Sequence, residues 1–207
     1  MVKAAQAAAT AASGDKDMIG KVVNAGDAAA KGGDETSVNG IASGIKGIVE
    51  AAEKAGEEGK LESEAAAGDG GNEDAGKLFA TKKKDDGGEA KDAEKAAAAV
   101  SAVSGKQILK AIVDAAGKED GEKKGVDDVK EATNPIEAAI GSTGDQNAAA
   151  AFNKDGMKKN DQIAAAIVLR GMAKDGEFAL KNNDAANAEK GLKSTVESAV
   201  NKTVVVV

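Results

Sequence analysis

The 207-residue chain contains no cysteine, histidine, tryptophan or tyrosine, and it has one proline and three phenylalanines. Without cysteine, the chain can form neither a disulfide nor a thiolate metal site. Without histidine, it lacks the side chain that most often transfers protons near neutral pH, and no segment pairs carboxylates or lysines on an apolar face. We therefore expect no enzymatic activity and no metal or cofactor.

Apolar runs long enough to cross a membrane are also missing. No window approaches the ~20 apolar residues that a bilayer requires, and the start MVKAAQ lacks the basic-then-apolar pattern of a signal peptide. The formal net charge of -7 disfavours nucleic acid as a partner, because phosphate binding needs a concentrated basic surface. The length is that of one domain, which we place over residues 1–207.

Apolar residues recur at helical spacing in several segments. In residues 37–54 they alternate by three and four positions, which is the pattern of one helix face, with Ser37 as the expected N-cap and Gly56 as the end. Residues 92–116 repeat the pattern, and Ser104 and Gln107 form a capping-box sequence, so two helices should meet there. Further helices are predicted in residues 134–141, starting at Asn134-Pro135, in residues 185–199, and in the alanine-rich residues 1–31.

Segments rich in glycine and charge separate these helices. They cover residues 56–76, 81–91, 117–131 and 141–156 and have the composition of solvated loops. Within them GNEDAGKL (71–78) nearly matches a phosphate-binding loop, but Leu78 stands where a magnesium-binding Ser or Thr is required. The sequence thus predicts an all-α fold, an elongated helical bundle with long charged loops.

Residues 157–181 differ from the rest because apolar side chains cluster there around Arg170, the only arginine. A helix starting at Asn160 or Asp161 and running to about Lys174 would be apolar nearly all round in its first two turns, which predicts a central core helix. Arg170 and Lys174 should oppose the negative helix terminus and reach solvent or a carboxylate. The residues expected to form this core helix are Ile163, Ile167, Val168, Leu169, Arg170 and Met172.

Lysines cluster at Lys82, Lys83 and Lys84 and again at Lys123 and Lys124. Acidic residues adjoin each cluster, which favours solvated loops. The alternative is a polyanion-binding surface made of these five lysines.

Several blocks resemble, in order, the variable large proteins of relapsing-fever spirochaetes and the related Vmp-like surface lipoproteins of Lyme spirochaetes. These blocks are SVNGIASGIKGIVEAAEKA (37–55), AGKLFA (75–80), AAVSAVSGKQILKAIVDAA (98–116), NPIEAAIG (134–141) and KNDQIAAAIVLRGMAKDGEFALK (159–181).

The resemblance implies an outer-surface lipoprotein of a bacterial cell whose expressed copy is switched or recombined to evade host antibody. Conserved blocks would form the helical framework, including a conserved buried helix in residues 157–181, and the segments between them would form loops. The chain would be a fragment of the mature lipoprotein, without signal, lipidated cysteine or the C-terminal segment, so that membrane contact requires an anchor absent here. Host antibodies are the expected partners; a host adhesin that binds glycosaminoglycans is the alternative, and self-association of the parent protein stays open.

Overall fold

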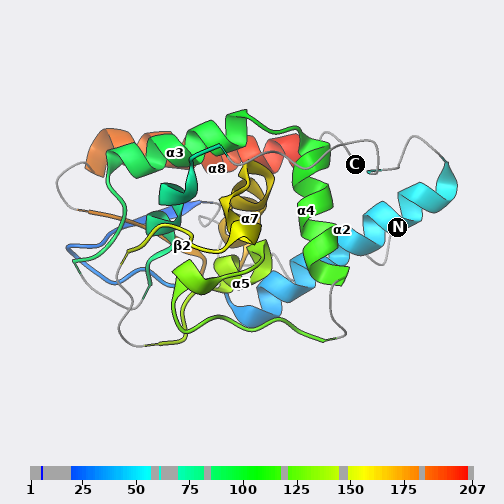
Figure 1. The fold of residues 1–207 in the computed structure, drawn as a ribbon, viewed down its shortest axis with the longest axis horizontal. Coiled ribbons are helices and arrows are strands. Elements are labelled where there is room, and N and C mark those ends of the chain that lie inside the picture. The colour runs from blue at the N-terminus through cyan, green and yellow to red at the C-terminus, as the bar shows by residue number, and fades with distance from the viewer. Residues whose placement is uncertain are drawn as a thin grey trace.

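The computed structural model describes residue 6 and residues 20–56, 61, 70–81, 85–117, 121–144, 149–181 and 185–204. The fold is mostly helical, as predicted, and elongated (Figure 1). Its α-helices are α2 (Glu35–Ala55), α3 (Ala90–Ser101), α4 (Gly105–Gly117), α5 (Pro135–Ile140), α6 (Asp155–Lys158), α7 (Asn160–Met172) and α8 (Ala185–Val204). Two 3-10 helices, η2 (Glu73–Phe79) and η3 (Val129–Glu131), and two strands, β1 (Lys21–Asn24) and β2 (Glu177–Leu180), complete the described elements.

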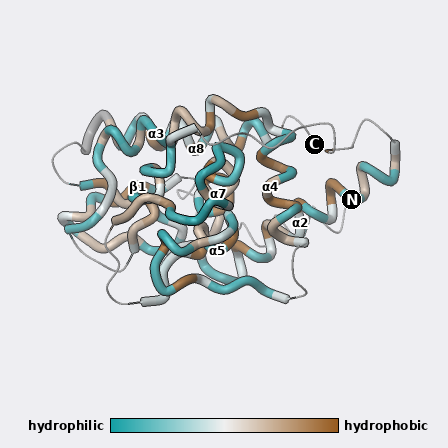
Figure 2. Tube along the Cα trace, in the orientation of Figure 1, coloured by the Kyte–Doolittle hydropathy of each residue, from teal (hydrophilic) through white to brown (hydrophobic). Residues whose placement is uncertain are grey.

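Helix α7 lies in the middle of the molecule and contacts α2, α3, α4, α5 and α8. Helices α3 and α8 run side by side along one long side, and α2 extends beyond the other helices at one end (Figure 1). The connection between α4 and α5 is mostly hydrophilic, whereas hydrophobic residues are concentrated on the helices (Figure 2). One main hydrophobic cluster therefore forms around α7.

Local capping signals in the sequence mark several helix ends correctly. Asn134 accepts hydrogen bonds from the backbone N–H groups of Ile136 and Glu137 at the start of α5. The backbone N–H of Ser104 donates to the Gln107 side chain, and the Gln107 N–H donates to the Ser104 hydroxyl, so the capping box separates α3 from α4. The two helices meet at 98°.

The N-cap predicted for the helix in residues 37–54 is wrong by one turn. Asp34, with an extended backbone, accepts a hydrogen bond from the Ser37 N–H at 2.9 Å, so α2 already begins at Glu35. The Ser37 hydroxyl instead accepts from the backbone N–H of Lys174 at 3.0 Å. Gly56 ends the helix as expected.

Two short strands were not predicted. β1 pairs with β2 in parallel, from Lys21 opposite Glu177 to Asn24 opposite Leu180. The expectation of helix is therefore wrong for residues 20–31, and for residues 1–5 and 7–19 it lies outside the described residues. On the side of β2 opposite β1, Gly88 forms a parallel β-bridge with Leu180. These segments form a small β layer at the end of the helical core where β1 and β2 lie.

Candidate functional site

The helix expected to be the core helix is enclosed by protein on all sides. Asn160 and Asp161 are buried at its start, and Lys159 occupies the capping position that we had expected one of them to take. The Asn160 side chain instead accepts a hydrogen bond from the buried Asn72 amide at 2.9 Å. Of the six residues proposed for its core, Met172 is half-buried, and the structure fully buries Ile163, Ile167, Val168, Leu169 and Arg170.

Arg170 does not reach solvent or a carboxylate, so that prediction is wrong. The helix ends at Met172, and the chain turns at Asp175, whose φ is 61°, into β2. Lys174 is exposed in this turn. The guanidinium is consequently enclosed by β2, the end of η2 and the end of α5.

Among the described residues, every hydrogen bond of the Arg170 side chain goes to a backbone carbonyl. Nε donates to the Ala139 oxygen at 2.9 Å and Nη2 to the Ala138 oxygen at 3.2 Å. Nη1 donates to the Phe79 oxygen at 3.0 Å and, at a longer 3.4 Å, to the Glu177 oxygen. One side chain thus joins three elements that lie far apart in the sequence.

The guanidinium keeps its charge despite being 0% exposed. Burial lowers the pKa of Arg170 to about 9, and the nearby Glu177 carboxylate partly offsets this effect. The side chain is therefore protonated at neutral pH. Glu177 is itself buried, and its carboxylate accepts hydrogen bonds from the Lys21 ammonium at 2.5 Å and from the Lys31 backbone N–H at 3.0 Å.

All three aromatic residues of the chain gather beside its one arginine. The ring of Phe79 lies 5.4 Å from that of Phe152 and 5.4 Å from that of Phe178, centroid to centroid. The Arg170 Cζ atom lies 4.7 Å from the Phe79 centroid, a cation–π distance. The sequence shows the apolar surroundings of Arg170 but does not reveal its contact with Phe79; the scarcity of arginine and phenylalanine in the chain is the one signal that could have suggested it.

The lysines proposed for polyanion binding are only partly visible. Lys82, Lys83 and Lys84 lie outside the described residues. Lys124 is exposed, whereas Lys123 is 8% exposed because its backbone is pinned against α2. The Asn39 amide donates to the Lys123 carbonyl at 2.7 Å and accepts from its N–H at 2.8 Å. Polyanion binding by these lysines stays a prediction.

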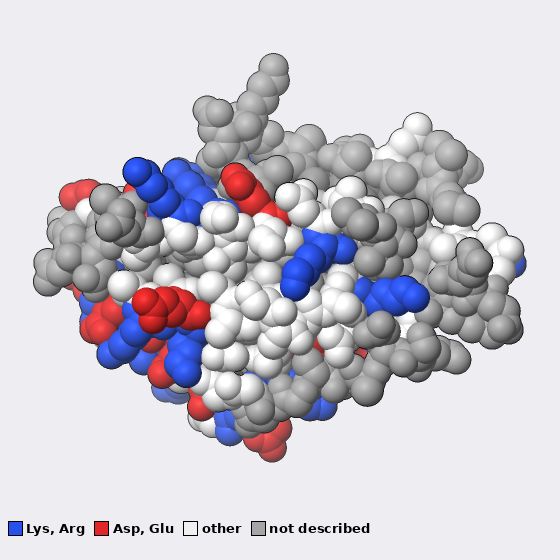
Figure 3. All heavy atoms as spheres, turned by 90° about the horizontal axis from the view of Figure 1, so that it is seen from above, with Lys and Arg blue, Asp and Glu red and all other residues white. Residues whose placement is uncertain are grey.

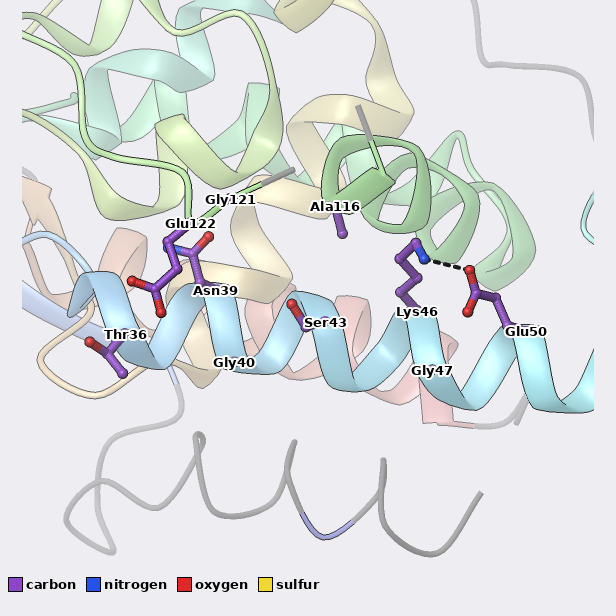
Figure 4. Close-up of a pocket in the computed structure, with 10 residues that line it drawn as sticks. All are labelled: Thr36, Asn39, Gly40, Ser43, Lys46, Gly47, Glu50, Ala116, Gly121 and Glu122. Carbon is purple, nitrogen blue, oxygen red and sulfur yellow. Dashed lines mark hydrogen bonds and ion pairs between the residues drawn. The ribbon is translucent and has the colours of Figure 1, made fainter. Parts of the chain in front are cut away.

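A polar hollow of about 560 Å³ lies along α2, next to this Asn39 contact (Figure 4). Lys46 and Glu50 both line it, and Lys46 donates a hydrogen bond to Glu50 one helical turn further along α2. This bond holds the pKa of the Glu50 carboxyl below its usual value. No cluster of three or more potential metal ligands occurs among the described residues. The hollow is lined by Thr36, Asn39, Gly40, Ser43, Lys46, Gly47, Glu50, Ala116, Gly121 and Glu122.

The segments predicted as loops between α4 and α5 and after α5 are tied to each other by backbone bonds. The Val126 N–H donates to the Gly141 carbonyl at 3.1 Å, and the Thr143 N–H donates to the Val126 carbonyl at 2.8 Å. Glu122, Lys124 and Asp127 in these segments are exposed. Backbone groups therefore fix the loops while charged side chains face solvent.

The side of the molecule that carries α3 and α8 shows a broad uncharged area with charged residues around it (Figure 3). Alanine and serine residues are exposed on both helices, among them Ala98, Ser194 and Ser198. Within the described part of the chain no single helix has the length and apolar composition of a membrane span; α3 and α4 pass that test only when taken together across their bend.

Comparison with known proteins gives one consistent answer. Residues 1–207 match the Borrelia lipoprotein family. Variable large protein 17 of Borrelia hermsii is 40% identical over 200 residues, 97% of this chain and 53% of that protein. Variable large protein 4 of the same organism is 37% identical over 171 residues, 82% of this chain and 45% of that protein. The chain thus spans about half the length of these relatives.

The fold agrees with a crystal structure. The Lyme disease variable surface antigen VlsE of Borrelia burgdorferi superposes with a TM-score of 0.81 at 49% identity, covering 98% of this chain and 65% of the VlsE chain. The family resemblance inferred from the sequence blocks is confirmed, and so is the mostly helical fold. This chain belongs to the Borrelia lipoprotein family and is a relative of its variable surface antigens.

Proposed function

We propose that the protein containing this chain is an antigenically variable lipoprotein of the bacterial outer surface, held there by a lipid anchor. Gene switching or recombination exchanges the expressed copy, so that host antibodies lose their target. Its role is evasion of host antibodies rather than catalysis.

The observation that carries this proposal is the division between a buried framework and exposed loops. Residues of α7 such as Ile167 and Leu169 are 0% exposed, whereas Glu122 and Lys124 lie on the surface of a segment held by backbone bonds. Substitution of exposed side chains away from special backbone features changes stability by less than about 0.5 kcal/mol. Epitopes in such loops can change without unfolding the protein.

The direct test is to sequence the expressed gene from serial isolates of one infected host. We expect either changes concentrated in the loop segments 56–76, 81–91, 117–131 and 141–156, or replacement of the whole gene by one that keeps residues like those at 157–181. Loops that stay unchanged over the course of infection would contradict the proposal.

The adhesin alternative makes a different demand on the loops, because a receptor-binding surface has to be preserved. Retention on heparin that weakens steeply with salt and is lost when Lys82, Lys83 and Lys84 are replaced by alanine would favour it. A Lys54→Ala variant is the matched control, because this lysine is exposed but lies outside both clusters, so its loss should leave most of the retention.

A further inference from the structure

We propose that Arg170 is a positioning residue for the exposed loop surface and that it acts through hydrogen bonds to main-chain carbonyls. This inference rests on the proposed function, since it concerns how one framework presents changing loops. It assigns to the buried helix α7 a role in what antibodies meet, although the helix itself is enclosed by protein.

The chemistry of the contact explains how this role tolerates sequence change. In the described part of the chain the guanidinium has four acceptors, and all are backbone oxygens, at the residues Phe79, Ala138, Ala139 and Glu177. A backbone carbonyl is present whatever side chain a residue carries, so the contact does not read sequence. The guanidinium has five donors in a rigid planar arrangement and can serve all four acceptors at once, whereas a lysine ammonium has three donors on a single nitrogen.

Three of the acceptor residues lie at the ends of η2 and α5, next to segments predicted as loops. Ala138 and Ala139 form the last turn of α5, and Gly141 directly after it accepts the backbone bond from Val126 that joins the two loops. The Ala139 oxygen also accepts from the Gly33 N–H at 3.0 Å, which ties the segment before α2 to the same point. Phe79 ends η2, shortly before the segment predicted as a loop in residues 81–91.

Gly141, the first residue after α5, packs directly against the Arg170 guanidinium. Its φ of +88° is a conformation that other residues adopt rarely, and a Cβ added there would lie 2.2 Å from Arg170 Nη2. A side chain at position 141 would have to displace the guanidinium. The residue that begins the loop and the residue that holds the end of α5 are therefore fitted to each other.

Amide hydrogen exchange of two variants tests the proposal. Arg170→Lys keeps the charge but cannot replace all four hydrogen bonds, and Gly141→Ala keeps every donor but disturbs the guanidinium. We expect protection of the Val126, Thr143 and Gly33 amides to fall about tenfold or more in both, while amides of α3 and α8 keep the protection set by global stability. If Arg170→Lys does not fold, Gly141→Ala carries the test through the Gly33 amide, which bonds the Arg170 acceptor Ala139 and not the strained Gly141.

Leu192→Ala is the matched control, because it removes a fully buried side chain of α8 and none of the Arg170 bonds. It should lower protection generally, without a selective loss at the loops. Monoclonal antibodies whose epitopes include Glu122 or Lys124 should bind the Arg170 and Gly141 variants at least about tenfold more weakly, and the Leu192 variant nearly as well as the wild type.

Unchanged loop protection in Gly141→Ala, or losses as uniform as those of Leu192→Ala, would overturn the proposal. These outcomes are separable from the proposed function. Loops that do not vary among serial isolates would defeat antigenic variation but leave the exchange result standing, whereas uniform exchange losses would defeat the positioning role even if the loops vary.

Discussion

Replacing Asn39 by alanine should detach the loop that begins at Gly121 from helix α2. The Asn39 amide makes three bonds: Nδ2 donates to the Glu35 oxygen at 2.8 Å and to the Lys123 oxygen at 2.7 Å, and Oδ1 accepts from the Lys123 N–H at 2.8 Å. The Lys123 groups are buried, and a buried polar group left without a partner costs about 1–3 kcal/mol. We expect a loss of about 3 kcal/mol, or about 6–12 °C in Tm for a chain of this size.

Thermal melting by circular dichroism and urea unfolding measure this loss, and exchange of the Lys123 amide locates it. Ser43→Ala is the control, since Ser43 is exposed one turn along α2 and lines the same hollow. It should melt within about 0.5 kcal/mol of the wild type. An Asn39→Ala protein that melts together with this control would refute the reasoning, because it would show that the amide bonds stabilise nothing.

Asn39→Asp adds a test of sign. The new carboxylate keeps the acceptor for the Lys123 N–H but faces two carbonyl oxygens, so its folded-state pKa should rise above the unfolded value of about 3.9. Its destabilisation is then present above the folded pKa and is relieved as pH falls through that value. When the unfolding free energies of the two variants are compared at each pH, Asn39→Asp should be less stable than Asn39→Ala at pH 7 and should regain stability in mild acid.

Three further predictions concern the framework. Ile167→Asp places an unpaired charge at a fully buried site and should abolish cooperative melting; a soluble variant that melts cooperatively would show that α7 is not enclosed. Asn134→Ala removes the cap of α5 and should cost about 1 kcal/mol in urea unfolding, whereas Asn134→Ser should restore most of it. Lys77→Met removes an ion-pair partner of Asp74 and of the buried Asp92. The hydrogen bond with Asp74 raises the pKa of Lys77 above 10.5. The wild type should therefore be more stable than the variant by the full amount at neutral pH, and this difference in unfolding free energy should vanish as pH rises through the raised pKa.

The sequence predicted those helix ends that depend on neighbouring residues. Asn134-Pro135 at the start of α5, Gly141 at its end and the Ser104–Gln107 capping box each involve groups within a few residues of one another, so a local pattern is sufficient. The cap of α2 was misplaced because Asp34 and Ser37 both suit that role. In the structure the Asp34 carboxylate accepts the Ser37 N–H, and the Ser37 hydroxyl accepts from the distant Lys174 N–H instead of capping the helix.

The features that the sequence did not reveal depend on distant partners. Strands β1 and β2 have four residues each, too few for a period to be read, and Glu177 lies 156 positions beyond Lys21. The setting of Arg170 was missed for the same reason. Helical periodicity placed it on one face near the helix end, but the turn at Asp175 that brings β2 over that face belongs to the tertiary fold.

The pairing of β1 with β2 also orders events in time. A ribosome or export channel releases residues 21–24 early, but their partner strand follows only after most of the chain. Closing so long a connection is entropically unfavourable until the helices between have folded and brought the two ends together. The β layer should therefore be the last part to form and the first to open, so a protease that acts on the opening chain should meet the segment around Lys21 before it meets α7.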